Sequence, residues 1–212
     1  MADKNPIDDL REIHKMMESS SKFLSLSGLS GIFAGITALV GAYISSLEVR
    51  AYEKKMIFYE LQGRAQEGYD EITFRLAFLA ALILFVALAF GVFFTWLKAK
   101  RQNKKLLTPL SFRLIISLMV PLAFGGLFVA ALVYRGYIEI IVPATLIFYG
   151  MSLLNGSKYV HVDIKYLALC QMALGVYCAF DPAFGFYAWI IGFGILHILY
   201  GAIMYFKYDM NK

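Results

Sequence analysis

The chain has 212 residues, of which 60% are apolar and 17% charged, and its formal net charge is +5. Soluble domains usually hold about 45–50% apolar and about 25% charged residues, because a fold of this size cannot hide more apolar surface from water. The composition therefore excludes an ordinary soluble enzyme, a disordered tail and a disulfide-stapled secreted module, and it indicates a membrane protein.

The first 22 residues are polar and carry charges of both signs, so we expect no cleavable signal peptide there. Asn5 and Pro6 suit the start of a helix. An apolar face follows at helical spacing, formed by Ile7, Leu10, Ile13 and Met17. We predict that residues 1–22 form a cytoplasmic, interfacial amphipathic helix that lies on the inner leaflet or docks on a partner.

A helix needs about 20 residues to cross a hydrocarbon core of about 30 Å, with a tolerance of a few residues. Six apolar stretches fit this length: Phe23–Ser46, Phe74–Leu97, Leu114–Tyr134, Ile138–Ser157, Tyr166–Phe180 and Ala183–Phe206. The fifth is short, and Lys165 can lengthen it by reaching the interface. The sequence thus predicts an all-α, polytopic bundle of six transmembrane helices over residues 23–206, followed by a cytoplasmic tail at 207–212.

Basic residues predict the orientation of these spans. Fourteen Lys and Arg residues fall on the side of the two termini and six on the other side, so both termini are expected in the cytoplasm. The inner loop 98–113 is strongly basic. The outer loop 47–73 mixes acidic, basic and apolar residues, and we expect it to be helical, extending from the membrane ends of the first two spans.

The interiors of the spans carry no Asp, Glu, Lys or Arg, which argues against an ion pump or a proton-coupled carrier. Pro121 and Pro143 are expected to kink the third and fourth spans. In the sixth span, Gly194, His197 and Gly201 form one helical stripe, and glycines on such a stripe mark close approach of a neighbouring helix. His197 is therefore expected to face protein, as a structural hydrogen-bonding group, a ligand-contacting or pH-sensing residue, or a metal ligand.

Polar residues gather in the cytoplasmic half of the predicted spans. The candidate ligand-binding residues are His197, Tyr200, Gln171, Tyr149, Ser152, Asn155, Ser27 and Ser30. The candidate helix-packing glycines are Gly31, Gly35, Gly194 and Gly201. Two explanations stay open: the polar groups tie helices together, at about 0.6 kcal/mol per bond, or they line a small neutral pocket that opens to the inner leaflet or the cytoplasm.

The sequence holds none of the common catalytic, nucleotide-binding or zinc-binding motifs. We expect no catalytic residue, no metal site and no cofactor, so a non-enzymatic role is favoured while a lipid-modifying enzyme stays open. The predicted function is binding of a small neutral or lipidic ligand, or of a partner protein, through the cytoplasmic half of the bundle. The alternative is a homo-oligomeric channel or facilitator for small solutes.

Several short segments resemble a group of uncharacterised six-span bacterial membrane proteins. These segments are Ser19–Gly35, Tyr149 to Asn155, Lys158-Tyr159, Tyr166 to Leu169, and Gly194 with His197, Tyr200 and Gly201. The resemblance implies a multi-pass protein of the bacterial inner membrane and brings no activity with it. Membrane lipids are the expected partners, a second copy or a cytoplasmic protein is open, and no nucleic acid is expected.

Overall fold

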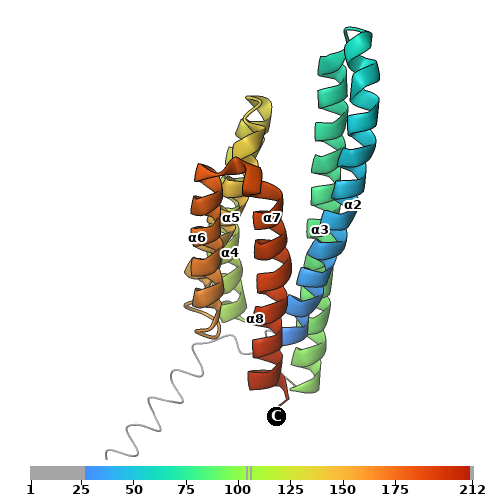
Figure 1. The fold of residues 1–212 in the computed structure, drawn as a ribbon. Helices are drawn as coiled ribbons and strands as arrows, with labels where there is room; N and C mark the ends of the chain where they lie inside the picture. Colours follow the sequence, from blue (N-terminus) through green and yellow to red (C-terminus); the bar gives the residue numbers. More distant parts are fainter. Residues whose placement is uncertain (1–26, 104, 106, 211–212) are drawn as a thin grey trace, which may run out of the picture. The chain divides into compact units, whose positions relative to one another are not determined.

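A computed structural model describes residues 27–103, 105 and 107–210 (Figure 1). Helices dominate these residues, which confirms the all-α class. The predicted interfacial helix within residues 1–22 and the start of the first predicted span, residues 23–26, lie outside the described residues.

The helices follow one another with short connections. In chain order they are α2 (Gly28–Leu61), α3 (Ala65–Arg101), α4 (Pro109–Tyr134), the short 3-10 turn η1 (Ile138–Ile140), α5 (Ile141–Gly156), α6 (Ile164–Phe180), and a C-terminal run of η2 (Pro182–Phe184), α7 (Gly185–Trp189), η3 (Ile190–Ile195), α8 (Leu196–Met204) and η4 (Tyr205–Asp209). The segments η3 and η4 are π-helical. Because the run Pro182–Asp209 is continuous from η2 to η4, we call it the C-terminal helix.

Five described helices are long and apolar enough to cross a membrane: Gly28–Leu61, Ala65–Arg101, Pro109–Tyr134, Ile138–Gly156 and Pro182–Asp209. The chain is accordingly a helical protein of membrane-spanning character. The fifth predicted span corresponds to Ile164–Phe180, which is apolar but has 17 residues.

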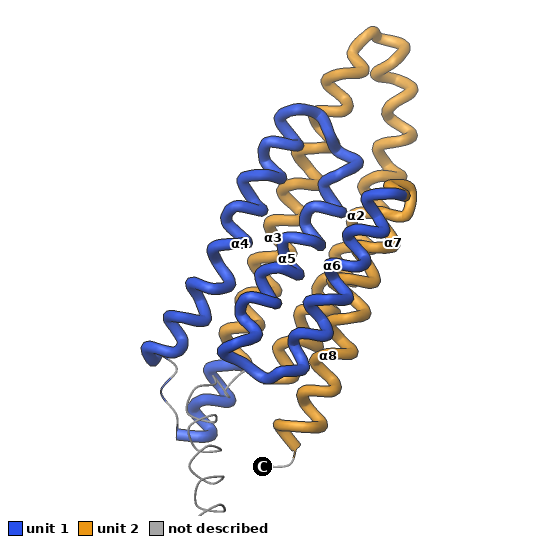
Figure 2. Tube along the Cα trace, turned by 90° about the vertical axis from the view of Figure 1, so that its left-hand side faces the viewer, with its two compact units in different colours: residues 1–26, 95–180 blue, residues 27–94, 181–212 orange. Residues whose placement is uncertain are grey.

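The described chain divides into two compact units, coloured separately in Figure 2. Unit 1 takes residues 95–180 and contains α4, α5 and α6. Unit 2 takes residues 27–94 and 181–210 and contains α2, most of α3 and the C-terminal helix. Helices from opposite ends of the sequence thus pack together in unit 2.

In unit 2 the first half of α2 packs against the C-terminal helix, and α3 returns alongside α2. Phe33 lies against Phe90 and Phe94, with ring centroids 5.4 and 4.7 Å away, and Ile83 fills the space beside Gly41. These contacts hold α3 to α2 within the apolar parts of both helices.

Helices α2 and α3 continue well beyond their apolar parts as a two-helix hairpin (Figure 1). Their 34 and 37 residues rise about 51 and 55 Å, against about 30 Å for a hydrocarbon core. The turn between them uses Gly63 at φ +69°, a left-handed conformation that glycine adopts without strain. The helical extension expected for residues 47–73 is thus present.

In unit 1, α5 packs between α4 and α6. Helix α4 starts with a capping box made by Thr108 and Ser111 and runs unbroken through Pro121 to Tyr134. Pro143, where the sequence predicted a kink, is the third residue of α5. The backbone N–H groups of a first turn have no partner within the helix, so a proline there removes no hydrogen bond.

Candidate functional site

The contact between α2 and the C-terminal helix is made through glycine backbones. A Cβ atom on Gly201 would lie 2.5 Å from the backbone nitrogen of Ile32, and one on Gly35 would lie 2.6 Å from the carbonyl oxygen of Gly194. A Cβ atom on Gly31 would lie 3.0 Å from the Cα of Gly201. The structure therefore places all four candidate packing glycines at this contact. A side chain on Gly31, Gly35 or Gly201 would meet backbone atoms of the other helix, and one on Gly194 would meet the side chain of Leu39.

His197 lies in the same contact region and is buried, with 7% of its surface exposed. Its Nδ1 is 2.9 Å from the carbonyl oxygen of Gly192. A carbonyl oxygen only accepts hydrogen bonds, so Nδ1 carries the proton, and in the neutral ring Nε2 is then the acceptor. The bond fixes both the tautomer and the direction of the imidazole.

The residues before His197 give this arrangement its local geometry. The carbonyl of Gly192 belongs to η3, a π-helical segment that ends at Ile195, and π segments are uncommon and occur often at functional sites. Trp189, Phe193 and His197 also form a ladder of rings along the helix, with centroid separations of 5.5 and 6.1 Å. The imidazole is thus held by a hydrogen bond and by the stacked ring of Phe193.

Ser27 lies at the start of α2, where the first helical N–H groups need acceptors. Its own side chain makes no capping bond to the helix. Asp209, at the end of the C-terminal helix, supplies the acceptor instead: its Oδ2 accepts from the Gly28 N–H at 2.9 Å and from the Ser27 hydroxyl at 3.3 Å. Ser30 donates to the carbonyl of Ser27 at 2.5 Å. Both candidate serines therefore take part in the start of α2.

Ser152 and Asn155, in unit 1, join α5 to α4. The Ser152 hydroxyl donates to the carbonyl of Leu118 at 2.7 Å, and Asn155 Nδ2 donates to the carbonyl of Ser117 at 2.9 Å. In an unbroken helix the carbonyl of residue 117 would accept from the N–H of residue 121, but that residue is Pro121 and has no N–H. Asn155 therefore satisfies the carbonyl that the proline leaves without its helical donor.

The remaining candidates divide between the two units. Gln171 on α6 is fully buried, and Tyr149 on α5 is half-buried, in unit 1. Tyr200 on α8 is half-buried in unit 2. Unit 2 thus brings Ser27, Ser30, His197 and Tyr200 onto two packed helices, and unit 1 carries Tyr149, Ser152, Asn155 and Gln171.

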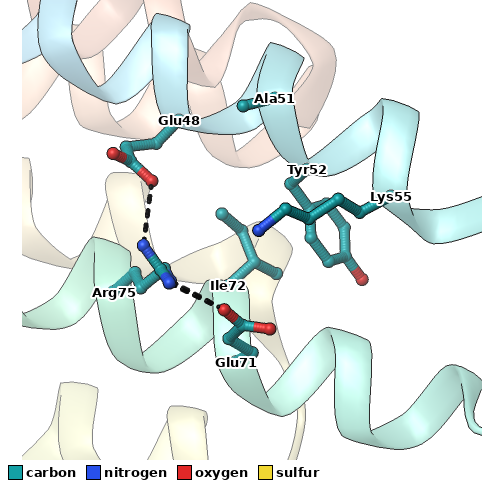
Figure 3. Close-up of a pocket in the computed structure, with 7 residues that line it drawn as sticks. All are labelled: Glu48, Ala51, Tyr52, Lys55, Glu71, Ile72 and Arg75. Carbon is teal, nitrogen blue, oxygen red and sulfur yellow. Dashed lines mark hydrogen bonds and ion pairs between the residues drawn. The ribbon is translucent and has the colours of Figure 1, made fainter. Parts of the chain in front are cut away.

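A second group of polar residues lies on the hairpin outside the apolar parts of α2 and α3 (Figure 3). Arg75 donates from Nη2 to Glu71 at 2.8 Å and faces Glu48 at 3.6 Å. Tyr59 donates to the other oxygen of Glu71 at 2.7 Å, and the Lys55 side chain points into the same space. We call Glu48, Lys55, Tyr59, Glu71 and Arg75 the hairpin cluster.

Hydrogen bonds change the acidity of two groups in this cluster. The bond from Tyr59, followed by the bond from Arg75, holds the pKa of the Glu71 carboxyl below its ordinary value of 4.5. The same bond to Glu71 raises the pKa of the Tyr59 hydroxyl above 10.0. Both shifts favour a Glu71 anion bonded to a neutral tyrosine.

A small hollow lies beside four members of the hairpin cluster, Glu48, Lys55, Glu71 and Arg75, and is also lined by Ala51, Tyr52 and Ile72 (Figure 3). Its volume is about 30 Å³, which is room for about two water molecules. Drug-sized and cofactor ligands need about 300 Å³ or more. The hollow is therefore too small for an organic ligand, and the hairpin cluster joins α2 to α3.

Sequence reasoning missed several residues that shape these regions. Asp209 is 181 residues from its partner Gly28, and no local pattern links the two. The role of Asn155 follows from Pro121 only once α4 and α5 are known to be neighbours. Trp189 and Phe193 did carry a signal, because rings four residues apart on a helix face each other.

Among the described residues, no group of three or more His, Cys, Asp or Glu side chains is arranged to hold a metal ion. In comparisons with protein-family models, with curated proteins and with solved structures, no match to this chain was found.

Proposed function

We propose that the chain is a six-span, non-enzymatic protein of the bacterial inner membrane, with both termini in the cytoplasm, which binds a small neutral or lipidic ligand in the cytoplasmic half of its helices. Five long apolar helices and the unequal distribution of Lys and Arg support the membrane part of this proposal. In it, Ile164–Phe180 is the remaining span. Its 17 residues rise about 26 Å, and Lys165 at its start can reach the interface.

The observation that carries the binding proposal is the fixed tautomer and orientation of the buried His197 ring. A buried imidazole is held in one tautomer by Gly192, directly after a π-helical segment, with Phe193 stacked beside it. Holding a ring in one orientation at a fixed depth is what selective recognition of a neutral polar group requires. A hydroxyl or amide of a lipid or small metabolite is a suitable partner for such a ring.

The hydrogen bonds made by three of the polar residues reduce the number of candidate ligand-binding residues. Ser152 and Asn155 donate to backbone carbonyls of α4, and Ser30 donates to the carbonyl of Ser27. The hydrogen-bonding groups of these three residues are therefore already used within the fold. His197 is therefore the central contact in the proposal, with Tyr200, on the same helix of unit 2, as a further lining residue.

Substitution of His197 tests the proposal. The protein is purified in lipid nanodiscs from the native membrane, and retained molecules are identified by native mass spectrometry. We expect a small molecule or a selected lipid on the wild type, and at least a tenfold lower occupancy on His197→Phe. The melting temperature should change little, because phenylalanine keeps the ring contact with Phe193.

Thr37→Val is the matched control, since the Thr37 hydroxyl donates at 2.8 Å to a carbonyl of its own helix, that of Phe33. This variant should retain the molecule fully. Equal retention by His197→Phe and the wild type would contradict the binding proposal. Solute flux in liposomes above that of empty vesicles would favour the channel alternative.

A further inference from the structure

The distal hairpin of α2 and α3 has an outer side on each helix, and the two sides differ in charge. On α2, one stripe recurs at spacings of three and four residues, and all its members are exposed: Leu47, Arg50, Lys54, Phe58 and Leu61. Ile57 adjoins it. Exposed fractions of 61% for Phe58, 64% for Ile57 and 83% for Leu61 are high for apolar side chains. We call these six residues the basic-apolar stripe.

The basic-apolar stripe faces away from α3. The α2 residues that contact α3 belong to the opposite side of the helix: Glu48 pairs with Arg75, Tyr52 packs against Tyr69, and Tyr59 bonds Glu71. The C-terminal helix contacts the first part of α2, around Gly28, Gly31 and Gly35. Within unit 2 the stripe is therefore left exposed.

The outer side of α3 carries the opposite charge. Gln66, Asp70 and Phe74 follow one another at spacings of four residues and are exposed, and Glu67 adjoins them. We call these four residues the acidic-apolar stripe. Gln66 donates to Asp70 at 3.0 Å and Arg64 pairs with Glu67, so Asp70 is the carboxylate of the stripe that no described cation contacts. Arg75 turns instead toward α2, where it contacts Glu71 and Glu48. Phe74, with 73% of its surface exposed, is the largest apolar group of the stripe.

The charged residues of the two stripes lie at matching levels along the length of the hairpin. The pair Glu48–Arg75 fixes which residues of α2 and α3 lie at one level. Lys54 is six residues from Glu48 toward the turn, and Asp70 is five residues from Arg75 toward the turn, so the two lie within about 1.5 Å of one level. By the same count, Arg50 lies at the level of Phe74. Copies of one protein in one membrane share their orientation, so these levels also match between copies.

From this match we propose that hairpins of neighbouring copies pack side by side, with the basic-apolar stripe of one copy against the acidic-apolar stripe of the next. Lys54 then meets Asp70, Arg50 lies over the ring of Phe74, and Ile57, Phe58 and Leu61 are covered. A two-fold contact between identical stripes would bring Lys54 to Lys54, with like charges opposed. The contact is heterologous, so repeating it adds further copies side by side.

The interaction rests on the membrane assignment and not on the ligand proposal, and cross-linking tests it directly. Two differently tagged copies are co-expressed, one carrying Lys54→Cys and the other Asp70→Cys, both with Cys170→Ser and Cys178→Ala. Oxidation in native membranes should link unlike copies at least tenfold more than like copies. A preference for like copies, or no link, would overturn the proposal.

Charge exchange gives a second measurement. Lys54→Glu should lower the fraction of oligomer in native nanodiscs at least tenfold, and Lys54→Glu with Asp70→Lys should restore it. Both side chains are exposed, so helicity and melting temperature should stay unchanged and separate this result from misfolding. Loss without restoration, or no loss, would overturn the pairing, because the face would then be free or covered by another part of the chain or by a foreign protein.

Discussion

In unit 2, α2 meets the C-terminal helix backbone to backbone, whereas in unit 1, α4 meets α5 through side chains. Gly201 approaches Ile32 so closely that no Cβ fits between them. At the α4–α5 contact, a Cβ on Gly156 would meet the side chain of Leu118, and the polar ties are made by Ser152 and Asn155. The first contact is intolerant of added volume, and the second depends on individual hydrogen bonds.

The largest expected effect is a loss of stability when glycine is replaced by alanine, and it should differ between the two contacts. Gly201→Ala should destabilise the protein by about 3 kcal/mol, because two backbones must separate. Gly156→Ala should cost less than about 1 kcal/mol, because the Leu118 side chain can change rotamer. Unfolding in mixed detergent measures both.

Gly91→Ala is the control for the intrinsic effect of removing a glycine, since no atom of a neighbouring residue lies within 4 Å of its added Cβ. It should be neutral or stabilising, by up to about 1 kcal/mol. Equal losses at Gly201 and Gly156 would remove the distinction between the two contacts.

A smaller effect is expected at the hydrogen bond that accompanies Pro121. Asn155→Ala should destabilise by about 0.6–1.7 kcal/mol, because the Ser117 carbonyl loses its donor. In a Pro121→Ala background the helix supplies its own N–H at that carbonyl, so the same change should cost close to nothing. A double-mutant cycle from unfolding titrations measures this coupling. Additive losses would show that Asn155 acts independently of the proline.

The smallest expected effect is a change in stability with pH at the hairpin cluster. This cluster is a third kind of helix contact, made by charged side chains. The lowered pKa of Glu71 means that its contribution to stability is present above the unfolded carboxyl pKa and is lost as pH falls through the lowered value. The raised pKa of Tyr59 means that its contribution is lost as pH rises through a value above 10.0.

Spin labels at Val49 and Thr73 would report the separation of the two helices as pH changes. We expect a constant distance at neutral pH and a broader distribution as pH falls through the lowered pKa of Glu71. Glu71→Gln lacks the carboxylate at every pH, so its distribution should already be broad at neutral pH and should not change on acidification. Further broadening of Glu71→Gln on acidification would assign the acid sensitivity to another carboxyl group.

Local pattern predicted much of this architecture. Apolar length located the long helices, and the spacing of Gly194 and Gly201 indicated a close helix contact, which lies at α2. The pairing of α2 with the C-terminal helix could not be predicted, because apolar helices are interchangeable by composition. The tautomer of His197 depends on the π-helical segment before it, and periodicity in apolar residues does not distinguish π from α geometry.

The sequence identified polar residues within the apolar helices, but it did not predict their contacts. Asn155 and Ser152 stood out as polar groups in apolar surroundings, yet their function as donors to α4 depends on which helix lies beside α5. Their partners are backbone carbonyls, and a sequence carries no mark of which carbonyl lacks its donor until a proline and its neighbour are placed together.

The bond between Asp209 and the Gly28 N–H has a consequence for biosynthesis. The acceptor for the first N–H of α2 is translated 181 residues after Gly28 itself. Until Asp209 emerges, the N-terminal end of α2 must rely on water or lipid headgroups for its hydrogen bonds. The start of α2 is therefore completed only after the C-terminal helix has been made, and a truncation before Asp209 would be felt at the start of α2.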